Sequence, residues 1–354
     1  MTRAGGAHDP GFCDNLRSMA KWFMAIPAVL LSLWTAQAPR PLEIYWIDVE
    51  GGGSTLIVTP AGESLLFDSG YAEGDRDPAR IEQVIRKEAG LSRLDYLVTS
   101  HFHQDHAGGV PSLSKRIPIG RFIDHGDSVE KTGNGRTLFE RYLAVAAPRR
   151  ESVKPGATIP LKGIEMTIVA SDGQVFQPAA REANPLCRSF QMQEEDRGEN
   201  GHSVGFVLRA GDFDFVSLGD LSWNFQARLS CPANLLGKID LFQATHHAVR
   251  DDVLPQQMWA MAPAVTVMNN GPEKGAGAAS VKTILRSPTL EDLWSLHRRL
   301  DNGPMLNASE PLTANLGVTA GCQGFWIRAR VPGDGTYTLT NSRNGFSKTY
   351  KVRR

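Results

Sequence analysis

Apolar residues occur in short runs along most of the chain, and glycine- or proline-rich turns separate these runs. Runs of this length that are rich in Val, Ile, Leu and Phe predict β-strands. Residues 77–89 differ, because apolar residues recur there at helical spacing and Gly90 follows, so this stretch predicts a helix. Further strands are expected at residues 42–49, 55–59, 64–67, 94–99, 121–124, 164–170, 203–209, 213–218, 239–244 and 264–268, and further helices at 137–146, 224–229, 255–261 and 278–286.

The order of these elements repeats, with strands first and alternating strands and helices later, over residues 42–150 and again over 160–300. Two such halves predict an α/β fold in which two sheets pack together with helices outside, a four-layer αββα sandwich. The tail, residues 321–354, contains two apolar runs joined by Pro-Gly-Asp-Gly and predicts a C-terminal β-hairpin. We therefore expect one domain over residues 39–320, with the hairpin packed on the same domain.

The first apolar stretch, residues 22–33, is about a dozen residues long, whereas a membrane-spanning helix needs about 20. Two basic residues precede it, and Ala36 and Ala38 follow at the spacing of a signal-peptidase site. We interpret residues 1–38 as a secretory signal peptide and expect an exported protein, periplasmic or secreted, without a membrane anchor after cleavage. An uncleaved anchor is the alternative.

Composition narrows the class of protein. The 354 residues include 41% hydrophobic residues, which excludes disorder as the main state. The 38 Lys and Arg residues balance the 38 Asp and Glu residues, so there is no strong nucleic-acid signal and a small-molecule or ester substrate is the expected partner. Of the four cysteines, Cys187 and Cys231 lie in loop-like contexts and are the favoured disulfide in an exported chain, which leaves Cys322 free.

The strongest chemical signal is the segment Ser-His-Phe-His-Gln-Asp-His-Ala-Gly-Gly, which directly follows the apolar run at residues 94–99. Imidazoles and a carboxylate are ligands that suit Zn, Mn or Fe. His101 and His103 project to the same side of an extended backbone and can share one ion. Asp105 and His106 lie past the bend and can serve a second ion.

Two later strands also end in ligand-type residues. Asp220 ends the apolar run at residues 213–218, and its carboxylate could bridge two metal ions. His246 and His247 follow the run at residues 239–244. Each feature alone is weak, but together with the first cluster they predict one metal site.

These residues resemble the metallo-β-lactamase-fold hydrolase superfamily, through an Asp68-Ser69-Gly70 turn, the His101-x-His103-x-Asp105-His106 motif, Asp220 and the region of His246. The opening Asp-Val-Glu-Gly-Gly-Gly is most similar to the branch with the hydrolase domains of DNA-uptake competence proteins and phosphorylcholine esterases. The resemblance implies that His246 joins Asp105 and His106 on the second ion, and that Asp68 steadies the ligand loop. The first ion needs a third protein ligand, for which His125 is favoured and Asp124 and His202 are alternatives.

The resemblance also implies a mechanism. Two divalent ions, zinc before manganese or iron, would hold a bridging hydroxide that attacks a phosphodiester or phosphate ester. Asp105 would be essential for turnover, and His247 could donate a proton to the leaving group. A glycine-rich loop after the strand at 264–268 would contact substrate through Asn269, Asn270 and Lys274.

Other activities remain open on the sequence alone. An amide, lactone or β-lactam hydrolase would use the same ligands, and a non-catalytic binding module would keep the fold without metal. A di-iron redox protein normally accompanies a flavin-binding domain, and the sequence shows no glycine-rich phosphate loop after a strand to supply one.

Overall fold

The computed structural model describes residues 40–178, 183–318 and 320–353. The expected signal peptide at 1–38 lies outside the described residues. Among those residues, no helix is both long and apolar enough to span a membrane.

Two nine-stranded sheets form the centre of the fold. The first sheet has the order β18 (Ser347–Lys351), β17 (Thr336–Asn341), β16 (Ile327–Val331), β1 (Leu42–Trp46), β2 (Thr55–Val58), β3 (Ser64–Phe67), β4 (Leu94–Val98), β5 (Ile119–Asp124) and β6 (Arg150–Ser152). The second has the order β15 (Thr313–Asn315), β14 (Asp292–His297), β13 (Val265–Met268), β12 (Leu241–Gln243), β11 (Phe213–Ser217), β10 (Gly205–Ala210), β8 (Glu165–Ser171) and β7 (Thr158–Ile159), with β9 (Gln174–Val175) paired to β8.

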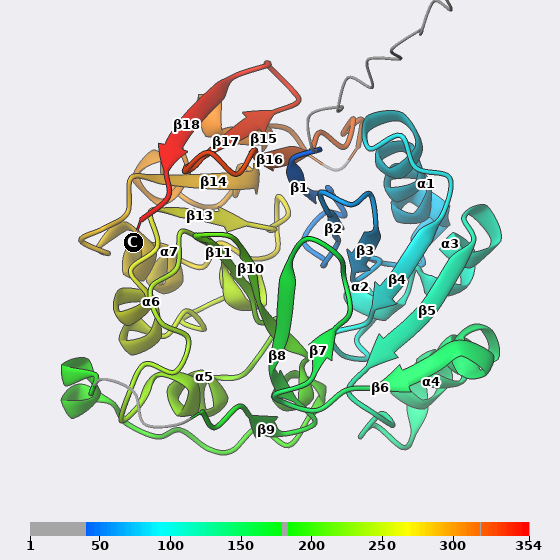
Figure 1. The fold of residues 1–354 in the computed structure, drawn as a ribbon, viewed down its shortest axis with the longest axis horizontal. Coiled ribbons are helices and arrows are strands. Elements are labelled where there is room, and N and C mark those ends of the chain that lie inside the picture. The colour runs from blue at the N-terminus through cyan, green and yellow to red at the C-terminus, as the bar shows by residue number, and fades with distance from the viewer. Residues whose placement is uncertain (1–39, 179–182, 319, 354) are drawn as a thin grey trace, which may run out of the picture. The chain divides into compact units, whose positions relative to one another are not determined.

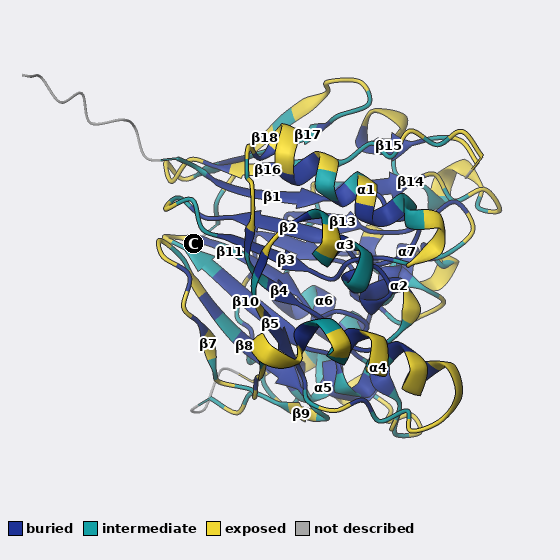
Figure 2. Cartoon of the chain, turned by 90° about the vertical axis from the view of Figure 1, so that its right-hand side faces the viewer, coloured by how far each residue is buried: buried dark blue, intermediate teal, exposed yellow. Residues whose placement is uncertain are grey.

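Helices cover the outer face of each sheet, as Figure 1 shows, with α1, α3 and α4 on the right and α5, α6 and α7 on the left. The first set, with a short α2, comprises α1 (Arg76–Gln83), α2 (Gln104–Ala107), α3 (Val110–Arg116) and α4 (Gly133–Ala146), and the second α5 (Trp223–Ser230), α6 (Pro255–Met261) and α7 (Ala278–Leu285). The helices turn buried faces to the sheets and exposed faces outward (Figure 2). The predicted four-layer αββα sandwich is therefore confirmed.

The inner layers are held by apolar side chains from both sheets. Trp46 of β1 meets Phe215 of β11 with ring centroids 5.7 Å apart, and Phe67 of β3 meets Phe206 of β10 at 5.0 Å. Both contacts are edge-to-face, the arrangement that aromatic rings prefer. These side chains are fully or almost fully buried and fix the two sheets against each other.

The C-terminal strands are part of the first sheet. The expected hairpin is present as β16 and β17, but β18 adds a third strand and β16 pairs with β1 in antiparallel register, with Ile44 opposite Ala329. Tyr337 and Leu339 of β17 are fully buried in the core between the sheets. The tail therefore completes the sandwich.

A disulfide joins Cys187 to Cys231, with Cα atoms 5.6 Å apart, and Cys322 is a free thiol. The bond connects the loop before β10 to the residue after α5, in the same region where Ala183 pairs with Ala233. This is the pairing that the sequence favoured.

Candidate metal centre

Parallel strands bring the candidate ligands to one edge of the sandwich. In the first sheet β3, β4 and β5 are parallel, and the segment with His101, His103, Asp105 and His106 follows β4. In the second sheet β11, β12 and β13 are parallel, and Asp220 follows β11. Because parallel strands end at the same edge of a sheet, these loops can converge on one point.

Four residues form one group, with one ligand atom of each within 4.8 Å of the others: Asp105, His106, Asp220 and His247. Nε2 of His106 lies 3.1 Å from Nε2 of His247 and 3.2 Å from an oxygen of Asp105 and of Asp220. Buried imidazoles and carboxylates that face one another are a donor set for a divalent cation. The residues therefore fit a metal ion.

His101 and His103 lie beside this group. Nε2 of His101 is 3.0 Å from Nδ1 of His103 and 3.9 Å from Oδ2 of Asp220. The same oxygen of Asp220 thus faces the imidazole of His101 and the imidazole of His106. The structure brings together every residue of the predicted His-x-His-x-Asp-His motif and places Asp220 between its two parts.

The paired histidines take different places from those predicted. His247, expected to donate a proton, points Nε2 into the group and is fully buried. His246, expected to bind the second ion, directs Nδ1 to Asp252 at 2.6 Å and leaves Nε2 3.4 Å from Asp220. His247 therefore belongs to the group and His246 lies beside it, the reverse of what was expected. The 3-10 turn Thr245–Ala248 causes this exchange, because both histidines have left-handed φ angles of 51° and 53°.

Left-handed backbone at non-glycine residues costs roughly 1–2 kcal/mol each. Ala248 continues the run with φ of 57°, so three consecutive residues are strained at the end of β12. Strain of this kind persists where the surroundings enforce it, and it clusters at functional sites. Here Nδ1 of His247 lies 3.2 Å from the carbonyl oxygen of Asn269, which fixes the direction of the ring.

Asp68 supports the ligand loop, as the sequence predicted. Its Oδ2 lies 2.7 Å from Nδ1 of His106, and its carboxylate accepts hydrogen bonds from the backbone N–H and hydroxyl of Ser100 at 2.7 and 2.8 Å. Gly53 packs against the same place, where a Cβ would lie 2.7 Å from Nδ1 of His106. Only glycine leaves room for this ring.

The favoured third ligand of the first ion lies elsewhere. His125 is fully buried, but its Nε2 is 2.9 Å from a carboxylate oxygen of Glu199, and the ring belongs to a different cluster with Asp172 and His202. Asp124 is also occupied, since it accepts hydrogen bonds from Tyr142 and Arg150. None of the three sequence candidates is grouped with His101 and His103.

Glu130 is one residue that sequence reasoning missed, with an oxygen 3.6 Å from Nε2 of His103. It lies in the loop before α4 and follows no apolar strand, so no strand-end signal marks it. Glu199 is another. It accepts a hydrogen bond at 2.9 Å from the backbone N–H of Phe102, between the two histidines of the loop.

The glycine-rich loop after β13 reaches the group, and its residues have different partners. Lys274 makes an ion pair with Asp105 and donates a hydrogen bond to the hydroxyl of Tyr71 at 3.3 Å. Asn269 contacts His247 through its carbonyl. Asn270 instead faces away, since its amide donates to the carbonyl oxygen of His297 at 2.9 Å.

The charges of the group are tightly coupled. Burial raises the pKa of Asp105 and Asp220, but neighbouring imidazoles, His106 first, outweigh burial and hold both pKa values well below their usual range. Burial lowers the pKa of His106, but Asp220, Asp105 and Asp68 raise it well above its usual value. His101 is different, because burial and nearby imidazoles leave its pKa well below the usual value. Both carboxylates are therefore anionic, as ligands for a cation must be.

Several curated proteins are similar in sequence to this chain. The chain is 28% identical to ribonuclease Z of Streptomyces avermitilis over 179 residues, 46% of this chain and 54% of that protein. It is 25% identical to a UPF0173 metal-dependent hydrolase of Cupriavidus taiwanensis over 149 residues, 39% of this chain and 47% of that protein. The chain thus spans about half the length of these curated relatives.

Among solved structures, the metallo-beta-lactamase fold protein YhfI from Bacillus subtilis matches 81% of this chain and 99% of its own, at 11% identity and a TM-score of 0.44. The sequence model of the family described as the metallo-beta-lactamase superfamily matches residues 48–254. That segment is more than half of the chain. It contains all the candidate metal ligands, the first of which is His101 and the last His247. The chain therefore belongs to the metallo-beta-lactamase superfamily.

Proposed function

We propose that the chain is a metal-dependent hydrolase that cleaves a phosphodiester or phosphate ester with two divalent ions at the strand-end group. The position of Asp220 carries the proposal, because its Oδ2 faces Nε2 of His101 on one side and of His106 on the other. A carboxylate in this place can serve two cations. Zinc suits a mixture of imidazole and carboxylate best, and manganese or iron would also fit.

The role of the protein's residues is to bind the two ions and to hold the ligand side chains in a fixed orientation. His101 and His103 would hold one ion, and Asp105, His106 and His247 the other, with Asp220 shared. When bound, such ions supply Lewis acidity and bring the pKa of water to about 7, so no protein nucleophile is needed. Asp68 and the carbonyl oxygen of Asn269 hold the outer nitrogens of His106 and His247. Outer partners of this kind fix tautomer and ring orientation.

His246 is placed to move a proton. Its Nδ1 is held by Asp252 at 2.6 Å, and its side chain is 17% exposed, so Nε2 lies between the buried group and solvent. Burial lowers the pKa of His246, but the charges of Asp220 and Asp252 raise it above the usual value. We assign to Nε2 of His246 the proton donation to the leaving group that the sequence assigned to His247.

Lys274 and Tyr71 favour an anionic substrate. The ammonium group of Lys274 lies beside Asp105 and 5.6 Å from the centre of the Tyr71 ring. Burial lowers the pKa of Lys274, but Asp105 and Tyr71 raise it above the usual value, so the side chain stays cationic. A cation here can meet the charged oxygen of a phosphate ester. The name of the ribonuclease relative agrees with this bond type.

A substrate panel tests the proposal. We expect the wild-type chain to cleave chromogenic phosphodiesters or phosphomonoesters in preference to lactones and β-lactams. Lys274→Met should lower kcat/KM for the phosphate ester by roughly tenfold or more, about 1.4 kcal/mol, and for neutral lactones by less. Lys162→Met is the matched control, because Lys162 is an exposed lysine paired with Glu63.

Faster turnover of lactones, amides or β-lactams by the wild-type chain would contradict the phosphate ester and support the alternative hydrolase. Fewer than one ion per chain in purified protein would contradict the hydrolase itself and leave a non-catalytic binding module.

We also propose export through the predicted signal at residues 1–38, with a small-molecule or ester substrate as partner. The disulfide between Cys187 and Cys231 supports export, because disulfides persist in oxidising compartments. The mass of the protein recovered from the periplasm or medium should correspond to cleavage after Ala38. Recovery of the full-length mass from the cytoplasm alone would contradict this.

A further inference from the structure

A second cluster of ligand-type side chains lies apart from the group around Asp220. A ring nitrogen of His125, a ring nitrogen of His202 and a carboxylate oxygen of Asp172 lie within 4.8 Å of one another. They come from three elements: the end of β5, the 3-10 turn Glu199–His202 and the turn after β8. The His125 side chain is fully buried, whereas those of His202 and Asp172 are 20% and 35% exposed. An ion can therefore reach the cluster from solvent.

Glu199 decides which nitrogen of His125 is available. One of its oxygens accepts hydrogen bonds from the Ser128 hydroxyl at 2.6 Å and the Val129 N–H at 2.7 Å, and the other from the Phe102 N–H at 2.9 Å. Burial raises the pKa of Glu199, but His125 and these donors hold it well below its usual value. An anionic carboxylate only accepts, so Nε2 of His125, 2.9 Å away, carries the hydrogen.

That tautomer leaves Nδ1 of His125 with a lone pair. Nδ1 is buried and has no hydrogen-bond partner within the described part of the chain. An unpaired buried acceptor of this kind destabilises the fold. A carboxylate behind the outer nitrogen of a histidine is the arrangement that orients imidazole ligands of metal ions. The orphaned lone pair therefore indicates a missing electron-pair acceptor.

His202 and Asp172 complete the donor set. Nδ1 of His202 lies 3.1 Å from Oδ1 of Asp172, and the rings of His202 and His125 have centroids 5.7 Å apart. The other oxygen of Asp172 contacts Lys154, an exposed side chain that can move to solvent. Two imidazoles and one carboxylate, with a position open to water, are a ligand set for zinc. We propose that His125, His202 and Asp172 form a zinc site separate from the centre around Asp220.

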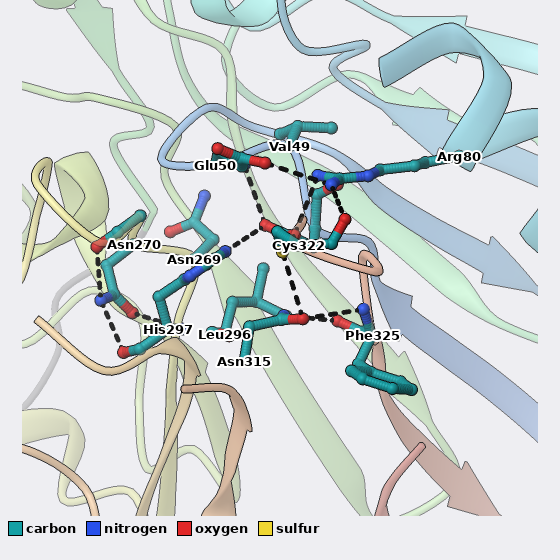
Figure 3. Close-up of polar contacts among 12 residues, drawn as sticks. Val49, Glu50, Arg80, Asn269, Asn270, Leu296, His297, Asn315, Cys322 and Phe325 are labelled. Carbon is teal, nitrogen blue, oxygen red and sulfur yellow. Dashed lines mark hydrogen bonds and ion pairs between the residues drawn. The ribbon is translucent and has the colours of Figure 1, made fainter. Parts of the chain in front are cut away.

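A competing cluster of Asp48, His297 and Cys322 also has a buried nitrogen without a partner among the described residues, Nδ1 of His297, but its carboxylate is fully occupied. Figure 3 labels His297 and Cys322 of this cluster. Oδ1 of Asp48 lies 2.7 Å from Nε2 of His297 and accepts the Glu50 N–H at 2.9 Å. Oδ2 accepts from Nη1 of Arg80 at 3.0 Å and from Sγ of Cys322 at 3.3 Å. Both oxygens are satisfied, and the guanidinium already supplies the positive charge. No lone pair of Asp48 is left for a cation there.

The proposed zinc site would also support the ligand loop. Glu199 connects His125 to the backbone of Phe102, which lies between His101 and His103. An ion on Nδ1 would hold the His125 ring in place and therefore hold the carboxylate that anchors this backbone. The site is thus a positioning element as well as a binding site.

Zinc stoichiometry tests the proposal on the full chain, by equilibrium dialysis against zinc followed by elemental analysis. His202→Ala and Asp172→Asn should each bind one zinc ion fewer per chain than wild type. Both side chains are partly exposed, so these variants should fold, and thermal unfolding checks this. Cys322→Ser is the matched control and should bind as many ions as wild type.

Equal zinc content in wild type, His202→Ala and Asp172→Asn would overturn the proposal. Loss of the ion in Cys322→Ser, with none in His202→Ala, would also overturn it and place the ion at the competing cluster. Because the readout is bound zinc, the result does not depend on whether the chain is a hydrolase.

Discussion

Replacing His247 with alanine should release metal from the centre and reduce hydrolysis by more than the roughly 10- to 100-fold that loss of an outer partner costs. Nε2 of His247 lies 3.1 Å from Nε2 of His106 and 3.3 and 3.4 Å from oxygens of Asp105 and Asp220. Alanine removes one of four converging donors, and the three that remain bind a divalent cation more weakly. Elemental analysis and turnover of the purified variant measure both effects.

His246→Ala is a closely matched control for this experiment. Both histidines have positive φ, 51° and 53°, so alanine at either position keeps the same backbone strain. His246 is bound to Asp252 through Nδ1, so its loss should leave the metal content unchanged, while the loss of proton donation should lower turnover by roughly 100- to 10,000-fold. Metal loss in His246→Ala together with retention in His247→Ala would contradict the assignment and support the one expected from the sequence.

Stability should fall at alkaline pH through His297. Burial lowers the pKa of this histidine, but its hydrogen bond with Asp48 raises it to about 9. A pKa raised from the ordinary value of about 6.5 contributes stability that is complete below pH 6.5 and is lost as pH rises through 9. The shift corresponds to roughly 3 kcal/mol of unfolding free energy.

Urea unfolding at pH 6 and pH 10 measures this effect, with His297→Gln as the comparison. The stability difference between wild type and His297→Gln should shrink by roughly 3 kcal/mol between the two pH values. Running both chains in a Cys322→Ser background removes the neighbouring thiol from the comparison. A difference that does not change with pH would show that His297 is neutral in the folded state.

The strand-end motif could be predicted from sequence because each part of it follows an apolar run. The segment from His101 to His106 comes directly after β4, and Asp220 comes directly after β11. Parallel strands carry such residues to the same edge, so the sequence pattern was sufficient to place them together.

The exchange of His246 and His247 could not be predicted in this way. The choice between adjacent residues depends on the left-handed backbone after β12, and no glycine or asparagine marks that conformation in the sequence. The position of His125 was hidden from the sequence for a similar reason. His125 follows an apolar strand as the ligands do, but Glu199, 74 residues away, holds its ring in another cluster.

Strands with short or mixed patterns were also missed. The sequence predicted no strand at β14, although Leu293, Trp294 and Leu296 are buried there, and the end of this strand places His297 against Asp48. Glu291 and Asp292 directly precede these apolar positions, so the apolar run is too short to predict a strand. The parallel pairing of β14 with β13 and β15, a tertiary feature, fixes the strand.

Anomalous scattering at the zinc absorption edge, from crystals of the full chain grown with zinc, tests the central claim most directly. We expect two peaks next to Oδ2 of Asp220, one contacted by His101 and His103 and the other by His106 and His247. Zinc peaks elsewhere on the chain, with none within bonding distance of these side chains, would contradict the account.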